Sequence, residues 1–272
     1  MNLANIDLLF TVRITSILCA FVIILSSLEY LKSYHFLSDK SYLSWDITKY
    51  NCKLPLNGFL GKIVDKFFSY TYYKYTILLR LLSAVLILLF ALYNINIPSI
   101  LYGIAAITTI SLIIRGMYGL DGSYHLNMII ITCLFLYSLF PQQSFGASLC
   151  IYFIAIQGIL SYLIAGITKL QGEKWRNGKA IIGIFGTKTY GNQIIYNYMY
   201  KRESISLLLA WFIIFFEIAY VFVLVVPFEY KLLILFTGIC FHAFNSLFMG
   251  LNSFFFSFLS AYPSILFLSI II

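Results

Sequence analysis

Charged residues are scarce in this sequence. They make up 10% of its 272 residues, whereas 61% of the residues are apolar and the mean hydropathy is +0.92. A water-soluble fold of this length has too small an interior to bury so much apolar surface, so the composition excludes a soluble globular protein. We therefore expect an integral membrane protein.

Cysteine and histidine are also few, and neither occurs in a metal-binding or disulfide-framework spacing. The cysteines are Cys19, Cys52, Cys133, Cys150 and Cys240, and the histidines are His35, His125 and His242. There is no CxxC pair, and no carboxylate cluster accompanies the histidines. We expect no disulfide framework and no metal site. The first residues have no basic n-region, so the first apolar run is not expected to be a signal peptide.

Long apolar runs dominate what the sequence does contain. Eight of them are candidate transmembrane helices, at residues 8–31, 74–94, 97–114, 124–140, 145–170, 204–226, 230–249 and 251–271. The short alternating segments of a membrane β-barrel are missing. Only residues 32–73 and 171–203 form substantial polar segments between the runs. We therefore predict one domain, residues 1–272, with an all-α fold: a polytopic helical bundle of about eight transmembrane helices.

Basic residues are concentrated on one side of these eight predicted spans. That side carries Lys32, Lys40, Lys49, Lys53, Lys62, Lys66, Lys74, Arg115, Lys169, Lys174, Arg176, Lys179, Lys188, Lys201 and Arg202, and the other side carries only Lys231. The positive-inside rule makes the basic side cytoplasmic and places both termini outside. The net charge of +8 then reflects topology and anionic lipids, and nucleic acid is not expected as a partner. The alternative is that the basic loops face an anionic substrate or partner.

Lys169 ends a long apolar run in the segment 161–178, which reads SYLIAGITKLQGEKWRNG. Two interpretations are open. A lysine inside a span usually faces a cavity or a partner, where it can act in chemistry. Alternatively, Lys169 extends to the membrane surface as an anchor, with Trp175 as a residue of the aromatic belt.

A second polar group lies near the end of the seventh run. His242, Asn245 and Ser246 are spaced i, i+3 and i+4 and so share one helix face, which we expect to point inward. Either these residues join helices by hydrogen bonds, or His242 transfers protons or orients a ligand while Asn245 binds a substrate oxygen.

Other charges near the spans are also expected to pair or to face a polar cavity, and Arg13 with Glu217 is a candidate pair. Asp121 lies in a glycine-rich segment between the third and fourth spans. It is either a substrate-binding residue or the N-cap of the following helix.

The residues of these two segments resemble a known family. Tyr162, Ala165-Gly166, Lys169-Leu170, Trp175 and Gly178 resemble the signature of the HTTM family, the transmembrane domain of vitamin K-dependent gamma-carboxylase and its bacterial relatives. Phe241-His242, Asn245-Ser246 and Phe248 are similar to a second carboxylase segment in a later helix. Weaker similarities are Arg13, the segment 119–125 and Tyr262-Pro263.

In the carboxylase, the lysine that matches Lys169 is regarded as the base that deprotonates vitamin K hydroquinone. The resemblance therefore implies that Lys169 is an active-site residue. Combined with the polar helix face, it makes Lys169 and His242 the catalytic candidates. The substrate-binding candidates are Tyr162, Trp175, Asn245 and Asp121, and no cofactor can be assigned.

Stand-alone bacterial relatives of this size resemble the SdpB-like branch, which is associated with maturation of a secreted antimicrobial peptide toxin together with a small partner protein. The first hypothesis is accordingly a multi-pass protein of the cell membrane needed for peptide-toxin production, with membrane lipids, a peptide precursor and a small protein as partners. The second is a membrane enzyme that uses a quinol or another lipid-soluble substrate, with Lys169 as base. A structural or transport role is the third.

Overall fold

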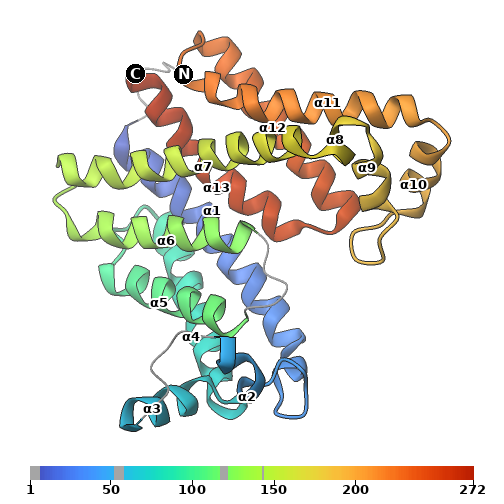
Figure 1. Ribbon diagram of the computed structural model, residues 1–272. Helices are drawn as coiled ribbons and strands as arrows, with labels where there is room; N and C mark the ends of the chain where they lie inside the picture. The colour runs from blue at the N-terminus through green and yellow to red at the C-terminus, as the bar shows by residue number, and fades with distance from the viewer. Residues whose placement is uncertain (1–6, 52–57, 117–121, 143) are drawn as a thin grey trace. The chain divides into compact units, whose positions relative to one another are not determined.

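The computed structural model describes residues 7–51, 58–116, 122–142 and 144–272. Within these ranges the chain is helical and contains no strand, so the predicted all-α fold is confirmed. The longest helices are α1 (Leu8–Lys32), α4 (Tyr70–Leu92), α5 (Ser99–Arg115), α6 (Gly122–Leu139), α7 (Phe145–Gln171), α11 (Glu203–Ala219), α12 (Phe228–Met249) and α13 (Asn252–Ile271), shown in Figure 1.

Seven helices in the described part of the chain are long and apolar enough to cross a membrane, counting α11 together with the short helix η4 (Tyr220–Leu224). The remaining predicted span, residues 97–114, corresponds to α5, which has 17 residues and lies at the lower limit of spanning length. Many large apolar side chains on these helices are exposed, and such a surface suits contact with lipid. The protein is a multi-pass helical membrane protein.

Proline and a left-handed residue mark several of the helix ends. Pro98 and Pro227 directly precede α5 and α12. Backbone N–H groups at a helix start have no partner within the helix, so a proline, which lacks this N–H, loses no hydrogen bond there. At its other end, α12 stops at Gly250, whose φ of 73° a residue with a Cβ rarely adopts. These local signals explain why the predicted and observed ends agree within a few residues.

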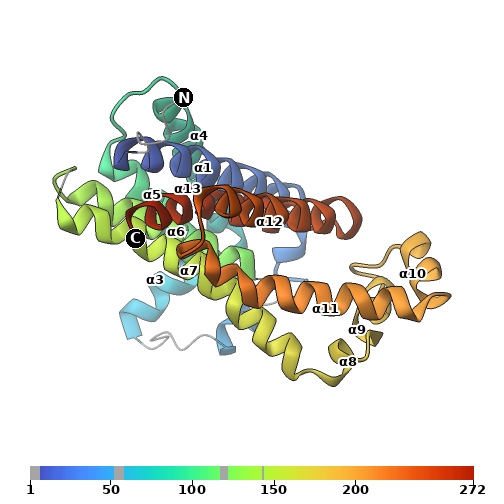
Figure 2. The same cartoon turned by 90° about the horizontal axis from the view of Figure 1, so that it is seen from above.

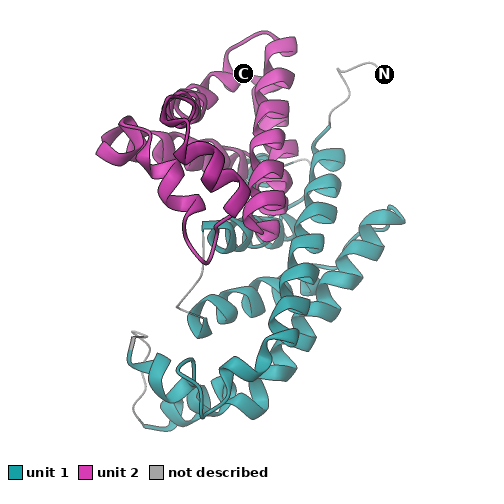
Figure 3. Cartoon of the chain, turned by 90° about the vertical axis from the view of Figure 1, so that its right-hand side faces the viewer, with its two compact units in different colours: residues 1–151 teal, residues 152–272 magenta. Residues whose placement is uncertain are grey.

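The chain divides into two compact units, Met1–Ile151 and Tyr152–Ile272, and the boundary falls within α7 (Figure 3). The prediction of a single domain stays a prediction. In the first unit α1 packs along α4, α4 along α5 and α5 along α6, and α1 also contacts α6 (Figures 1 and 2).

A buried arginine binds helices α1, α4 and α5 together. The guanidinium of Arg80 donates to Ser27 Oγ at 2.7 Å, Ser26 Oγ at 3.0 Å, the carbonyl of Ile23 at 3.2 Å and Thr109 Oγ1 at 3.2 Å. A charge inside an apolar bundle is stable only when its donors are taken up by the protein. Serines at the α1 surface supply acceptors and also allow close helix packing.

Arg115, at the end of α5, holds the polar segment between α1 and α4. It is buried, and it donates to the carbonyls of Leu43 at 2.7 Å, Leu37 at 3.1 Å and Phe68 at 3.2 Å. We counted Arg115 among the basic loop residues that report topology. Because its guanidinium is bound by three carbonyls of that segment, Arg115 also packs the segment against the end of α5.

The same polar segment contains the short helices η2 (Tyr34–Leu37), α2 (Trp45–Thr48) and η3 (Lys49–Asn51), followed by α3 (Gly58–Phe68). Tyr34 donates its hydroxyl hydrogen to the carbonyl of Tyr70, and its ring stacks on the Tyr70 ring with the centroids 4.9 Å apart. Burial raises the pKa of the Tyr34 hydroxyl to about 12. The segment is therefore packed onto the bundle by aromatic contacts.

Helix α3 exposes an apolar face formed by Phe59, Leu60, Ile63 and Phe67. Lys62 and Lys66 belong to the same helix. An amphipathic basic helix of this kind is typical of a segment that lies along a membrane surface.

In the second unit α12 packs along α13, and the short helices α8 (Glu173–Arg176) and α9 (Lys179–Phe185) pack on α11 (Figure 1). Helix α10 (Gln193–Tyr200) contacts both α9 and α11. We expected Lys231 to be the single basic loop residue on its side of the membrane. It lies instead in the first turn of α12, where it is buried and donates to the carbonyl of Ser269.

The Arg80 network gives a stability prediction. Replacing Ser27 by alanine leaves a buried guanidinium N–H without its acceptor, so we expect Ser27→Ala to lower the free energy of unfolding by about 1–3 kcal/mol. The matched control is Ser83→Ala, because Ser83 is equally buried but bonds only the carbonyl of Arg80 in its own helix, at 2.9 Å. Its loss should stay below about 1 kcal/mol. Denaturant unfolding in detergent measures both, and equal losses would contradict the assigned role of Arg80.

Candidate functional site

Helices α7, α11, α12 and α13 of the second unit contribute the polar side chains of the candidate site. Tyr162 and Lys169 are seven residues apart on α7, which places them on one face about 10 Å apart along the helix axis. Each binds a different partner, so the site has two parts: an ion pair at Lys169 and a hydrogen-bonded aromatic group at Tyr162.

The ion pair joins Lys169 to Glu217 of α11. The ammonium Nζ lies 2.6 Å from Glu217 Oε2 and 2.7 Å from Oε1, and the two side chains are 19% and 4% exposed. The ammonium also lies 5.2 Å from the centre of the Trp175 ring, in a cation–π contact. Lys169 is thus bound inside the second unit by a carboxylate and an indole.

A glycine permits this approach. A Cβ at Gly166, one turn before Lys169, would lie 2.8 Å from Ile218 and 2.9 Å from the backbone nitrogen of that residue. The absence of a side chain therefore lets α7 and α11 come close enough for Lys169 to reach Glu217.

The aromatic group is centred on the hydroxyl of Tyr162. This hydroxyl lies 2.7 Å from His242 Nε2 and 2.6 Å from the hydroxyl of Tyr262. The Tyr162 ring stacks on Tyr220, with centroids 3.8 Å apart, and the imidazole of His242 stacks on Phe258 at 4.3 Å. The polar atoms are therefore enclosed by aromatic rings.

His242 has one ring nitrogen left over. The residue is 2% exposed, and its Nδ1 has no hydrogen-bond partner in the described part of the chain. If Tyr162 donates to Nε2, Nδ1 carries an unused hydrogen, and if Nε2–H donates to Tyr162, Nδ1 is an unused acceptor. In either tautomer a buried polar atom remains for a ligand to bind.

The arrangement can support proton transfer. It contains a lysine and a carboxylate in direct contact, and a separate chain of two hydroxyls that ends on an imidazole. In the described ranges no three histidine, cysteine or acidic residues gather where they could hold a metal ion.

The chain matches no protein-family model, no curated protein and no solved structure. Its resemblance to the HTTM family stays a prediction that rests on the motif residues themselves.

The structure brings four of the six predicted site residues into two contacting pairs, Lys169 with Trp175 and Tyr162 with His242. Asn245 lies one turn beyond His242 and is half-buried, and its neighbour Ser246 binds Asn252 at 2.6 Å. Asp121 lies outside the described residues.

Sequence reasoning missed the partner of Lys169. We proposed Arg13 for Glu217, but that carboxylate binds Lys169, and Arg13 binds carbonyls of α4 within the first unit. The usable signal was that Glu217 is the one acidic residue between Phe212 and Phe228, in an otherwise apolar run. Tyr220 and Tyr262 were not proposed as site residues, because tyrosine is common throughout this chain.

The ion pair predicts a strong coupling between two substitutions. Glu217→Leu leaves the ammonium of Lys169 without its carboxylate, so we expect it to lower the free energy of unfolding by about 3–5 kcal/mol. Lys169→Met together with Glu217→Leu removes both charges and should recover most of that loss. Denaturant unfolding of the four members of this cycle measures the coupling, and additive losses would contradict a buried pair.

Gly238, one turn before His242, predicts an unusual response to alanine. Alanine normally stabilises a helix relative to glycine, but a Cβ at Gly238 would collide with the hydroxyl of Tyr262 and crowd that of Tyr162. We expect Gly238→Ala to lower the free energy of unfolding by about 1–3 kcal/mol. Gly183→Ala in the short helix α9 is the control, because nothing lies within 4 Å of its Cβ, and it should be neutral or slightly stabilising. Stabilisation by both substitutions would show that the hydroxyls do not pack on α12.

Proposed function

We propose that this multi-pass membrane protein belongs with the HTTM proteins and serves in the production of a secreted antimicrobial peptide toxin in the cell membrane. Its expected partners are a peptide precursor, a small partner protein and membrane lipids. The proposal rests on the motif residues of segments 161–178 and 241–248, which resemble that family.

One observation supports it most directly. The two segments lie far apart in the sequence, yet Tyr162 of the first and His242 of the second are joined by a hydrogen bond of 2.7 Å. Side chains that serve one site must be held together in this way, whereas motifs that match by chance have no reason to meet. Within the first segment, Lys169 and Trp175 are also in contact.

The second candidate is a membrane enzyme that takes a quinol or another lipid-soluble substrate. The partly buried pair of Lys169 and Glu217 favours it, because a charged pair inside an apolar unit is costly to desolvate and is common where protons are moved. Lys169 would receive a proton from the substrate hydroxyl while it passes one of its own to Glu217, so that the carboxylate ends as the proton acceptor. The Trp175 ring, in contact with Lys169, suits a planar substrate.

The first experiment compares Lys169→Ala with the wild type in cells that also carry the genes next to the gene of this protein, where the peptide precursor and the small partner protein are expected to be encoded. Mature secreted peptide is measured by mass spectrometry, and the level of the protein in the membrane by immunoblot. We expect at least a tenfold loss of peptide with the membrane level kept, because a working site loses its base or its substrate contact. Lys174→Ala is the matched control, since Lys174 lies in the same segment but is exposed and should leave the product unchanged.

Three outcomes separate the candidates. If Lys169→Ala and Lys174→Ala both yield normal peptide, the ion pair only joins helices and the toxin proposal fails. If peptide is lost with Lys169→Ala and also with Glu217→Gln, which removes the acceptor charge but keeps the shape, the enzymatic reading is supported. Loss with Lys169→Ala alone assigns Lys169 to binding of the precursor or the partner protein.

A further inference from the structure

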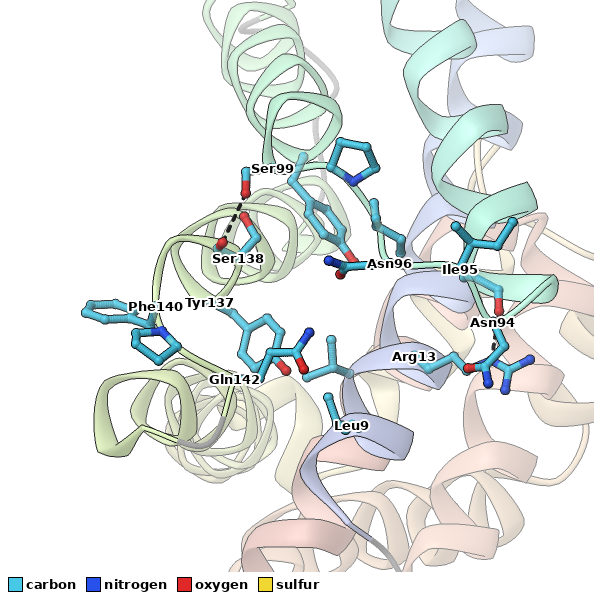
Figure 4. A pocket seen from close by; sticks show the side chains of 16 residues that line it. Leu9, Arg13, Asn94, Ile95, Asn96, Ser99, Tyr137, Ser138, Phe140 and Gln142 are labelled. Atoms are coloured by element: carbon cyan, nitrogen blue, oxygen red, sulfur yellow. Dashed lines mark hydrogen bonds between the residues drawn. The ribbon is translucent and has the colours of Figure 1, made fainter.

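A separate cavity lies in the first unit, where the start of α1, the end of α4, the start of α5 and the end of α6 meet. Its volume is about 540 Å³, within the range of small-molecule sites. Figure 4 shows Arg13 and Asn94 on one side of the opening and Tyr137 and Gln142 on the other. None of these residues belongs to the candidate site of the second unit.

Arg13 brings a positive charge to this cavity and is held in place by the end of α4. Its Nε donates to the carbonyl of Ala91 at 2.7 Å and its Nη2 to that of Leu92 at 3.0 Å. Asn94 adopts a positive φ of 57° and ends the helix, with its own N–H on the carbonyl of Ala91. These bonds leave Nη1 of the guanidinium for another acceptor.

Tyr137 supplies a second unused donor. It is 6% exposed, and its hydroxyl has no hydrogen-bond partner in the described part of the chain. Tyr102 lines the same cavity and is equally buried, but its hydroxyl lies 2.6 Å from Ser16 Oγ. An unpaired buried hydroxyl destabilises a fold, so the difference between these two tyrosines points to a ligand at Tyr137.

The lining defines the chemistry of that ligand. Its polar side is one guanidinium, the amides of Asn94, Asn96 and Gln142 and the hydroxyls of Ser99, Tyr102, Tyr137 and Ser138, and none of the described residues that line it carries a carboxylate. The acidic residue that acts electrostatically on Tyr137 is Asp7, which caps α1 by accepting from the N–H of Phe10 at 2.6 Å.

The rest of the lining is apolar, with Leu9, Val12, Ile95, Ile97 and Phe140 as its main members. We propose that this cavity binds an amphipathic anion: a carboxylate or phosphate head group on Arg13 and Tyr137, with the first part of an acyl chain along the apolar wall. A free fatty acid and an acyl phospholipid share this chemistry.

The test is ligand binding to the purified full-length chain, followed by native mass spectrometry from a neutral detergent. The probes are dodecanoate, lauroyl lysophosphatidylglycerol, inorganic phosphate and dodecanol, the last being a neutral molecule with the same chain as dodecanoate. We expect dodecanoate or the lysophospholipid to bind at least tenfold more tightly than dodecanol, because the alcohol has no negative charge to accept hydrogen bonds from Arg13 and Tyr137. Binding of dodecanoate alone identifies a fatty-acid site, binding of the lysophospholipid alone a phospholipid site, and binding of phosphate an anion site that needs no chain.

Matched tyrosine variants decide whether binding takes place in this cavity. Tyr137→Phe should lower the affinity for the anionic probe about three- to tenfold, because it removes a hydrogen-bond donor to the head group. Tyr102→Phe should leave binding unchanged, since its hydroxyl is already used by Ser16. Arg13→Gln should weaken binding at least tenfold. Thermal unfolding without ligand checks the fold of each variant, and Tyr137→Phe, which breaks no bond in the free protein, keeps the test valid if Arg13→Gln fails to fold.

Two results would overturn the proposal. One is equal binding of dodecanol and the anionic probes, which would show a purely apolar pocket. The other is wild-type affinity for the anionic probe in folded Tyr137→Phe, which would place any bound anion elsewhere on the protein.

Discussion

The cost of placing charge inside an apolar helical bundle governs this structure. A guanidinium or ammonium that has left water must find acceptors within the protein, and each buried or partly buried cation discussed above has done so. Arg80 binds hydroxyls and a carbonyl, Arg115 binds loop carbonyls, Lys231 binds the carbonyl of Ser269, and Lys169 binds a carboxylate.

Lys169 differs from the other three in the kind of partner it has. The carbonyl oxygens and the serine and threonine hydroxyl oxygens around Arg80, Arg115 and Lys231 are very weak bases that take no proton from a cation, so these three residues have structural surroundings. A carboxylate can accept a proton, and Glu217 is in direct contact with the ammonium. The aromatic group at Tyr162 and His242 lies about two helical turns away on the same face of α7. This combination of an exchangeable pair and an incompletely bonded imidazole is why the candidate site is assigned to the second unit.

The sequence predicted the class and the helices well, because both depend on local properties. Composition alone requires a membrane environment, and Pro98, Pro227 and Gly250 mark helix ends through backbone geometry. Partners could not be read in the same way. Lys169 and Glu217 are 48 residues apart, and their contact depends on a close helix approach at Gly166 that no local pattern reveals. The packing role of Arg115 was not predicted for the same reason, since its acceptors are carbonyls, which every residue has and which no sequence motif marks. The unpaired hydroxyl of Tyr137 was also invisible, because it differs from Tyr102 only in its surroundings.

The direct contact between Lys169 and Glu217 is the central claim, and solid-state NMR of the protein in lipid bilayers tests it most directly. The chain is labelled with ¹⁵N at lysine Nζ and ¹³C at glutamate Cδ, and the dipolar coupling between the two nuclei is measured. The account predicts a strong coupling from one lysine–glutamate pair that disappears in Lys169→Arg. A spectrum with no such coupling, or one that Lys169→Arg leaves unchanged, would contradict it.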